Sequence, residues 1–100
     1  MKVVLPGHRY ELASVEGRAP QSLVFIEKAL QSGRGFETIS DGTTTEEVLW
    51  VLIDRTRFLN ATLSCRENSI AITKLEEALM WLEKRTADRA ARRVEGRFEP

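Results

Sequence analysis

Two long stretches with helical periodicity, joined by a very short link, constrain the fold of this chain more than any other feature. Apolar residues keep helical spacing from Val48 to about Leu63, and a second helical pattern begins near Asn68. The break between the two patterns spans only residues 64–67. Because so short a link cannot carry the chain far, the sequence predicts an antiparallel helical hairpin over residues 43–97.

The first forty residues instead have the pattern of short β-strands. In residues 9–14, Tyr10, Leu12 and Ser14 alternate with Arg9, Glu11 and Ala13, which is the two-residue period of a strand. Ser22–Lys28 is dense in the branched and aromatic side chains that strands favour. A third strand is expected at Phe36–Ile39, after a glycine-rich turn. These segments predict a small N-terminal antiparallel β-sheet over residues 1–40. Together with the hairpin they predict an α+β fold in a single domain, residues 1–100.

Polar residues mark the expected starts of both helices. Glu46 follows Thr43 by three residues, and Glu47 follows Thr44 by three residues, which is the spacing of a capping box. Asn68 stands where the second helix is expected to begin, and capping that helix would be its ordinary role. The first helix is therefore expected to follow the strand region directly.

Charge is balanced over the whole chain but is concentrated at its end. Fifteen basic residues match fifteen acidic ones, and this zero net charge argues against bulk electrostatic binding of long nucleic acid. Residues 84–97 nevertheless hold six lysines and arginines against two acidic residues. An anion is therefore expected to bind at this basic end rather than over a broad surface.

Residue types that carry metal or catalytic chemistry are sparse. Cys65 is the only cysteine, so no disulfide can form within the chain and a cysteine-rich metal site is excluded. His8 is the only histidine and belongs to no catalytic motif. No stretch approaches the roughly 20 apolar residues of a membrane span. We therefore expect a non-enzymatic protein in a reducing cytoplasm, with no cofactor, no metal ion and no membrane partner.

Four residues are candidates for a binding site, and each also has an ordinary structural role. Arg85 and Arg89 share one helix face, where two guanidiniums would suit phosphate, but they could also complement the C-terminal helix dipole. Phe58 could belong to the core or could stack on a base near the hairpin tip. Asn68 could cap a helix or hydrogen-bond a base or ribose.

The C-terminal half resembles a helical hairpin that two kinds of phage immune-evasion protein share. These are the first family of Thoeris anti-defence proteins and the anti-CBASS cyclic-nucleotide sponge. The resemblance rests on residues 67–86 and continues through Asp88-Arg89, Arg92 and Val94-Glu95-Gly96. Arg93 and Arg97 depart from the family's pattern, which usually has glycine and threonine at these two positions.

The N-terminal part favours the Thoeris anti-defence family over the cyclic-nucleotide sponge. The sponge is more nearly helical throughout, whereas this chain resembles the Thoeris proteins before its helices as well. The residues that carry this part of the resemblance are His8, Tyr10 and Leu12, the strand over residues 23–28, and Asp41-Gly42-Thr43-Thr44 before the first helix. The resemblance therefore extends over about residues 8–97.

The resemblance implies a protein that binds and sequesters glycocyclic ADP-ribose without cleaving it, as a dimer or hexamer, in the cytoplasm of the infected bacterial host. The ligand-binding Phe, Asn and two Arg of the family fall on Phe58, Asn68, Arg85 and Arg89. One alternative is a sponge mainly or additionally for CBASS cyclic di- or trinucleotides. Alternatives of other classes are an enzyme that hydrolyses the signal, or a small nucleic-acid-binding or structural phage protein.

Overall fold

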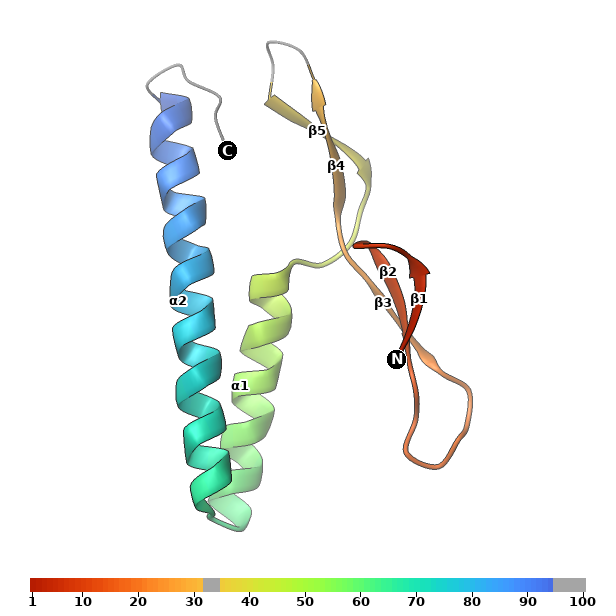
Figure 1. Cartoon of the computed structure of the whole chain (residues 1–100), viewed down its shortest axis with the longest axis vertical. Helices are drawn as coiled ribbons and strands as arrows, with labels where there is room; N and C mark the ends of the chain where they lie inside the picture. The colour runs from red at the N-terminus through yellow and green to blue at the C-terminus, as the bar shows by residue number, and fades with distance from the viewer. Residues whose placement is uncertain (32–34, 95–100) are drawn as a thin grey trace. The chain divides into compact units, whose positions relative to one another are not determined.

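The computed structural model describes residues 1–31 and 35–94, which fall into two compact units (Figure 1). The first unit, Met1–Thr44, consists of antiparallel β-strands, and the second unit begins at Thr45 and contains two helices. This order of elements confirms the predicted α+β fold, in which N-terminal antiparallel strands precede a helical hairpin.

Three strands form the first sheet, in the spatial order β1-β2-β3. They are β1 (Lys2–Leu5), β2 (Arg9–Leu12) and β3 (Gln21–Val24), and neighbouring strands are antiparallel. Gly7 lies in the turn between β1 and β2 with a φ of 78°, a left-handed conformation that glycine adopts without steric cost. The connection of β1 to β2 therefore depends on a residue without a Cβ atom.

The strand predicted over Ser22–Lys28 is in fact two strands that belong to different sheets. The first of these, β3, ends at Val24. The second, β4 (Glu27–Gln31), pairs instead with β5 (Gly35–Ser40) in a separate two-stranded antiparallel sheet. The prediction of one continuous strand was therefore wrong, although its two parts are extended as expected.

The division of this strand follows from the partners of two consecutive backbone amides. The Phe25 amide donates to the His8 carbonyl at 2.7 Å, whereas the Ile26 amide donates to the Thr43 carbonyl at 2.8 Å. Gly42 makes the second approach possible, because a Cβ atom there would lie only 2.5 Å from the Phe25 carbonyl carbon. The segment before the first helix is thus bonded to the backbone between β3 and β4.

The helical unit is an antiparallel hairpin of α1 (Thr45–Thr62) and α2 (Arg66–Val94), as Figure 1 shows. The link between the helices comprises only residues 63–65. Thr44 directly precedes α1, and Glu47 is the third residue of the helix, which is the arrangement of a capping box. The predicted hairpin and the predicted start of its first helix are therefore confirmed.

The helix cap predicted at Asn68 was wrong. The second helix begins at Arg66, so Asn68 is already its third residue. The tip of the hairpin is held instead by Asn60, whose Oδ1 accepts a hydrogen bond from the Cys65 amide at 3.1 Å. Its Nδ2 also donates to Ser69 Oγ at 3.4 Å. An amide at the end of the first helix, rather than at the start of the second, therefore ties the two helices together.

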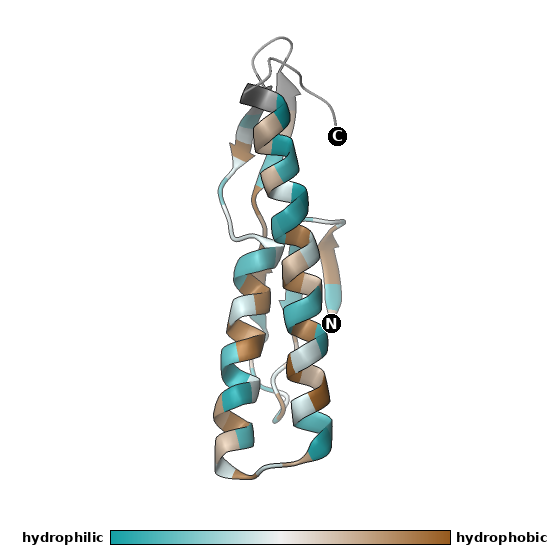
Figure 2. Ribbon diagram, turned by 90° about the vertical axis from the view of Figure 1, so that its left-hand side faces the viewer, coloured by the Kyte–Doolittle hydropathy of each residue, from teal (hydrophilic) through white to brown (hydrophobic). Residues whose placement is uncertain are grey.

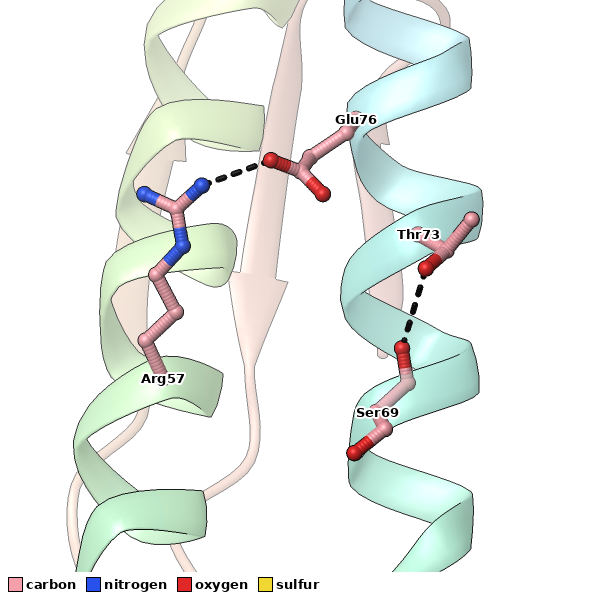
Figure 3. A network of polar contacts seen from close by, with 4 residues as sticks. All are labelled: Arg57, Ser69, Thr73 and Glu76. Atoms are coloured by element: carbon pink, nitrogen blue, oxygen red, sulfur yellow. Dashed lines mark hydrogen bonds and ion pairs between the residues drawn. The ribbon is translucent and has the colours of Figure 1, made fainter.

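A narrow apolar seam joins the two helices. Only Ile53 and Leu79 are buried among the residues whose exposure is described. Half-buried apolar side chains continue the seam: Val48, Leu49, Ile72, Leu75 and Leu82. An ion pair crosses between the helices, where Arg57 Nη2 lies 2.6 Å from Glu76 Oε2 (Figure 3). Local bonds such as that from the Thr73 hydroxyl to the Ser69 carbonyl lie within α2 and do not add to this connection.

Large apolar side chains of the hairpin also face outward, away from the seam. Figure 2 shows brown apolar positions along both helices, while the last turns of α2 are mainly teal. Five of these side chains are between 49 and 70% exposed: Trp50, Val51, Phe58, Met80 and Trp81. A single hairpin therefore leaves several large apolar side chains uncovered on its outer faces. Neither α1 nor α2, over its described length, is apolar enough to cross a membrane.

Candidate functional site

The C-terminal part of α2 extends beyond α1. Helix α2 has 29 residues and α1 has 18, and the two run antiparallel from the same short link (Figure 1). Because Arg57 meets Glu76, an antiparallel pairing brings the first residue of α1 opposite about residue 88 of α2. The basic end therefore begins opposite the first turn of α1, where Arg85 lies, and from about Arg89 onward it has no part of α1 opposite it.

Arg85 and Arg89 lie together at a shallow hollow of about 220 Å³ on the surface of α2. One helix supplies its whole lining: Trp81, Lys84, Arg85, Asp88, Arg89 and Arg92. Its only carboxylate, Asp88, is bound by Lys84, with 3.1 Å between Nζ and Oδ2. Neither Arg85 nor Arg89 forms a hydrogen bond or ion pair with another residue in the described part of the chain. The two guanidiniums are therefore free to bind an anion.

The helix dipole does not account for the position of these two arginines. Helix α2 continues to Val94, so Arg85 lies nine residues and Arg89 five residues before its end. The stabilising effect of the dipole on a cation falls off within the last turn. The Arg89 Nε atom is also shielded from solvent without a hydrogen-bond partner. A bound anion would supply the acceptors that this pair of side chains lacks.

Phe58 lies on the outer face of α1 and does not belong to the core of the hairpin. It is 70% exposed, and it lies five residues after the buried Ile53, which places it on a different side of the helix. Phe58 lines an open hollow of about 540 Å³ together with Trp50, Val51, Asp54 and Arg55. Phe58 is therefore not a core residue of a single hairpin, so the ordinary alternative for it was wrong. Its ring is exposed and can stack on a ligand.

Asn68 lies at the other end of the hairpin from the basic residues. It is half-buried in the first turn of α2, and its side-chain amide makes no hydrogen bond with another described residue. Its donors and acceptor are therefore not used to hold the tip, since Asn60 does that.

The structure brings Arg85 and Arg89 together but does not bring them to Phe58 or Asn68 in the same chain. Asn68 and Arg85 are 17 residues apart on one straight helix, which corresponds to about 26 Å. Phe58 lines a separate hollow that is built from α1 alone. One chain therefore presents the four predicted site residues at three separate places.

Sequence reasoning did not single out Trp81, which also lines the hollow of Arg85 and Arg89. Trp81 is 64% exposed, although it lies in the middle of a long helix. The signal that could have found it is its spacing, because it precedes Arg85 by four residues and so shares its helix face.

The other residues that the sequence singled out do not form a second site. His8 Nε2 lies 3.9 Å from Glu27 Oε1, and Cys65 is exposed in the link between the helices. No group of three or more His, Cys, Asp or Glu that could hold a metal ion occurs within residues 1–31 and 35–94. The side chain of Arg93 and the whole of Arg97 lie outside the described part of the chain.

Comparison with known proteins identifies the family. Residues 26–87 match the family described as Acb2/Tad1, hairpin domain, and this region includes Phe58, Asn68 and Arg85 but ends before Arg89. The chain is also 50% identical over 70 residues to Thoeris anti-defense 1 of Bacillus phage SBSphiJ7. That match covers 69% of this chain and 49% of the relative, so the chain spans about half the length of the relative. The chain belongs to the Acb2/Tad1 hairpin-domain family.

Proposed function

We propose that this chain is a phage anti-defence protein that binds glycocyclic ADP-ribose and sequesters it without cleavage, which blocks Thoeris immunity. Membership of the Acb2/Tad1 hairpin-domain family supports this function, as does the 50% identical phage relative named Thoeris anti-defense 1. The protein would act in the cytoplasm of the infected bacterial host. Because sequestration is stoichiometric, the role is one of binding rather than catalysis.

The observation that best supports this ligand is the pair Arg85 and Arg89, which have no hydrogen-bond or ion-pair partner in the described part of the chain. Glycocyclic ADP-ribose contains a pyrophosphate, and the guanidiniums of Arg85 and Arg89 are one helical turn apart in a single hollow. Charge-assisted hydrogen bonds from such forks to phosphate oxygens are about twice as strong as neutral ones. Asp88 does not compete for them, because Lys84 binds its carboxylate.

The hollow on α2 would be one part of a larger pocket. Its volume of about 220 Å³ is below the roughly 300–1,000 Å³ that is usual for sites that enclose a small molecule. Asn68 of the same chain lies about 26 Å along the helix from Arg85, and Phe58 lines a different hollow that is built from α1 alone. A second copy of the chain would therefore supply Phe58 to stack on the adenine and Asn68 to hydrogen-bond the base or a ribose.

Assembly into a dimer or hexamer also suits the surface of the hairpin. The seam between the helices buries only Ile53 and Leu79 among the described residues, whereas Trp50, Val51 and Phe58 of α1 remain exposed. Contact between copies would cover part of this apolar surface and would stabilise a small helical unit. Symmetry would then produce at least two equivalent sites per assembly.

Calorimetry followed by ligand recovery tests the proposal directly. The purified chain is titrated with glycocyclic ADP-ribose, the complex is denatured by heat, and the released compound is identified by mass spectrometry. We expect tight binding, near the −12 kcal/mol that corresponds to a nanomolar dissociation constant, and full recovery of the intact ligand. Recovery of a hydrolysed product would show an enzyme, and no binding at all would overturn the proposed function.

A panel of other ligands distinguishes the remaining alternatives. Cyclic di- and trinucleotides are compared with cyclic ADP-ribose isomers by thermal shift, because they share phosphates and purine bases with the proposed ligand. Preference for the cyclic oligonucleotides would favour a CBASS sponge. Binding to DNA or RNA that weakens steeply with salt, together with indifference to the small nucleotides, would favour a nucleic-acid-binding protein.

Mixing two defective variants tests whether the site is shared between chains. Arg85→Ala and Phe58→Ala chains are unfolded together and refolded, so that mixed assemblies form. If each site combines Arg85 of one copy with Phe58 of another, a mixed dimer regains one intact site of two, and calorimetry detects it. If both residues of a site come from one chain, the mixture binds no better than the separate variants.

A further inference from the structure

Trp81 is an exposed aromatic residue at the hollow that holds Arg85 and Arg89. It precedes Arg85 by four residues and Arg89 by eight, so the three side chains form one column along α2. It points away from the seam, because Leu79, only two positions earlier, is the buried residue of this helix. The indole is therefore 64% exposed in a helix whose other face is occupied by α1.

The column combines an aromatic ring with two cations, which are complementary to the base and to the phosphates of a nucleotide. Successive members of the column are separated by about 6 Å along the helix axis. The ring and the two cations are therefore close enough to contact the base and the phosphates of one nucleotide. A base stacks on aromatic rings because every base has a π-face, and phosphates bind guanidinium forks. The lining holds four cations and one carboxylate, so the hollow is also positive overall.

We propose that Trp81 is a further ligand-contacting residue, which stacks on the purine base of the nucleotide whose phosphates bind Arg85 and Arg89. This inference rests on the proposed function, and it assigns the base and the pyrophosphate of one ligand to the same helix. Phe58 of a second copy would then cover the opposite face of the adenine. The base would be held between two aromatic rings from two chains.

A role for Trp81 in contacts between copies makes different predictions from a role in stacking. A packing contact needs apolar bulk, which leucine also supplies, whereas stacking needs an aromatic face. Trp81→Leu and Trp81→Phe therefore separate the two roles. Met80→Ala serves as the matched control, because Met80 is 57% exposed next to Trp81 but does not line the hollow.

Calorimetry with glycocyclic ADP-ribose on the full chain provides the first measurement. We expect Trp81→Leu to weaken binding by about 5-fold to 150-fold, the range for loss of one stacked base. Trp81→Phe should stay within about threefold of the wild type, and Met80→Ala should bind as the wild type does. Sedimentation velocity on each variant should show an unchanged assembly.

Tryptophan fluorescence provides the second measurement. The chain has two tryptophans, so Trp81 is the only one in a Trp50→Phe background. Stacking of the adenine on Trp81 should quench its emission, with the same midpoint as the calorimetric titration of that background. If Trp81→Leu loses its helical circular dichroism, its calorimetric affinity no longer reports on stacking, and the fluorescence titration of the Trp50→Phe protein tests the role of Trp81 by itself.

The outcomes separate this inference from the function on which it rests. If the wild type binds the ligand and Trp81→Leu binds it equally well, the role of Trp81 is overturned while the proposed function stands. If Trp81→Leu does not fold, unquenched Trp81 emission from the Trp50→Phe protein at saturating ligand overturns it in the same way. If the wild type takes up no ligand, the proposed function fails first and this inference fails with it.

Discussion

The two halves of the hairpin use their polar side chains in different ways. Near the tip, polar groups connect the helices: Arg57 is paired with Glu76 at 2.6 Å, and Asn60 bonds to the link and to the start of α2. At the basic end, Arg85 and Arg89 have no partner among the described residues, and the nearby carboxylate is bound by a lysine. The bonds of Arg57 and Asn60 thus stabilise the hairpin, whereas Arg85 and Arg89 are available to bind a ligand.

This difference means that stability and ligand affinity can be altered separately in one helix pair. Substitutions in the seam, or of side chains such as Asn60 that bond the two helices to each other, should change the free energy of unfolding and leave the affinity of folded protein unchanged. Substitutions of Arg85 or Arg89 should do the reverse, because neither side chain makes a hydrogen bond or ion pair with another described residue. The four predictions below test this separation, and all stability measurements are compared at one chain concentration because assembly adds to stability.

The largest effect is expected from Leu79→Ala, in the seam. Leu79 is 4% exposed, and removing a buried leucine side chain typically costs about 2–5 kcal/mol of unfolding free energy. Urea unfolding followed by circular dichroism at 222 nm measures this cost. Ile70→Ala is the control, because Ile70 is an apolar residue of the same helix that is 45% exposed, and it should cost much less. Equal costs for the two variants would show that the seam is not the core.

The next largest effect is expected at the basic end. Arg85→Ala and Arg89→Ala should each weaken glycocyclic ADP-ribose binding by about 1–3 kcal/mol, the scale of a hydrogen bond to a charged group. Their unfolding free energies should stay within about 0.5 kcal/mol of the wild type, since neither side chain has a partner in the described hairpin. Unchanged calorimetric affinity in both variants would remove these residues from the site.

A smaller effect should distinguish the two asparagines at the tip. Asn60→Ala loses hydrogen bonds to Cys65 and Ser69 and should reduce the unfolding free energy by about 1 kcal/mol. Asn68→Ala loses no hydrogen bond to another described residue, so it should unfold as the wild type does but bind the ligand several-fold more weakly. If Asn68→Ala instead lowered the unfolding free energy and Asn60→Ala weakened ligand binding, the roles assigned to the two asparagines would be wrong.

The smallest effect is expected from Arg57→Ala. The Arg57 and Glu76 side chains are about half exposed, at 52 and 47%, and solvent screening limits such an ion pair to about 0–1 kcal/mol. Ligand affinity should not change, in contrast to the loss expected for Arg85→Ala. A drop in affinity for Arg57→Ala with an intact fold would mean that partnered arginines also contribute to the site.

The sequence was sufficient to predict those parts of the fold that depend on local spacing. The helical hairpin and the capping box before α1 were predicted, because apolar periodicity and cap chemistry act over a few residues. The strand over Ser22–Lys28 was not divided correctly. Its division depends on Thr43, which is 17 residues away from Ile26 in the chain and reaches it only because Gly42 has no side chain.

The candidate site shows the same distinction between local and long-range information. The shared face of Arg85 and Arg89 followed from their four-residue spacing, and one hollow contains both. The ordinary roles of Phe58 and Asn68 were misjudged, because the covered helix face and the start of α2 are properties of the folded pair.

By itself, the sequence determined that strands precede two antiparallel helices and that two arginines share one face near the end of the second. Only the tertiary structure decided that these arginines have no partner within residues 1–31 and 35–94, that Phe58 faces outward, and that the four predicted site residues do not meet in one chain. The physical reason is that helical periodicity sets which residues are neighbours on one helix. Exposure and distance depend on the register and relative lengths of both helices, which leave the last turns of α2 uncovered by α1.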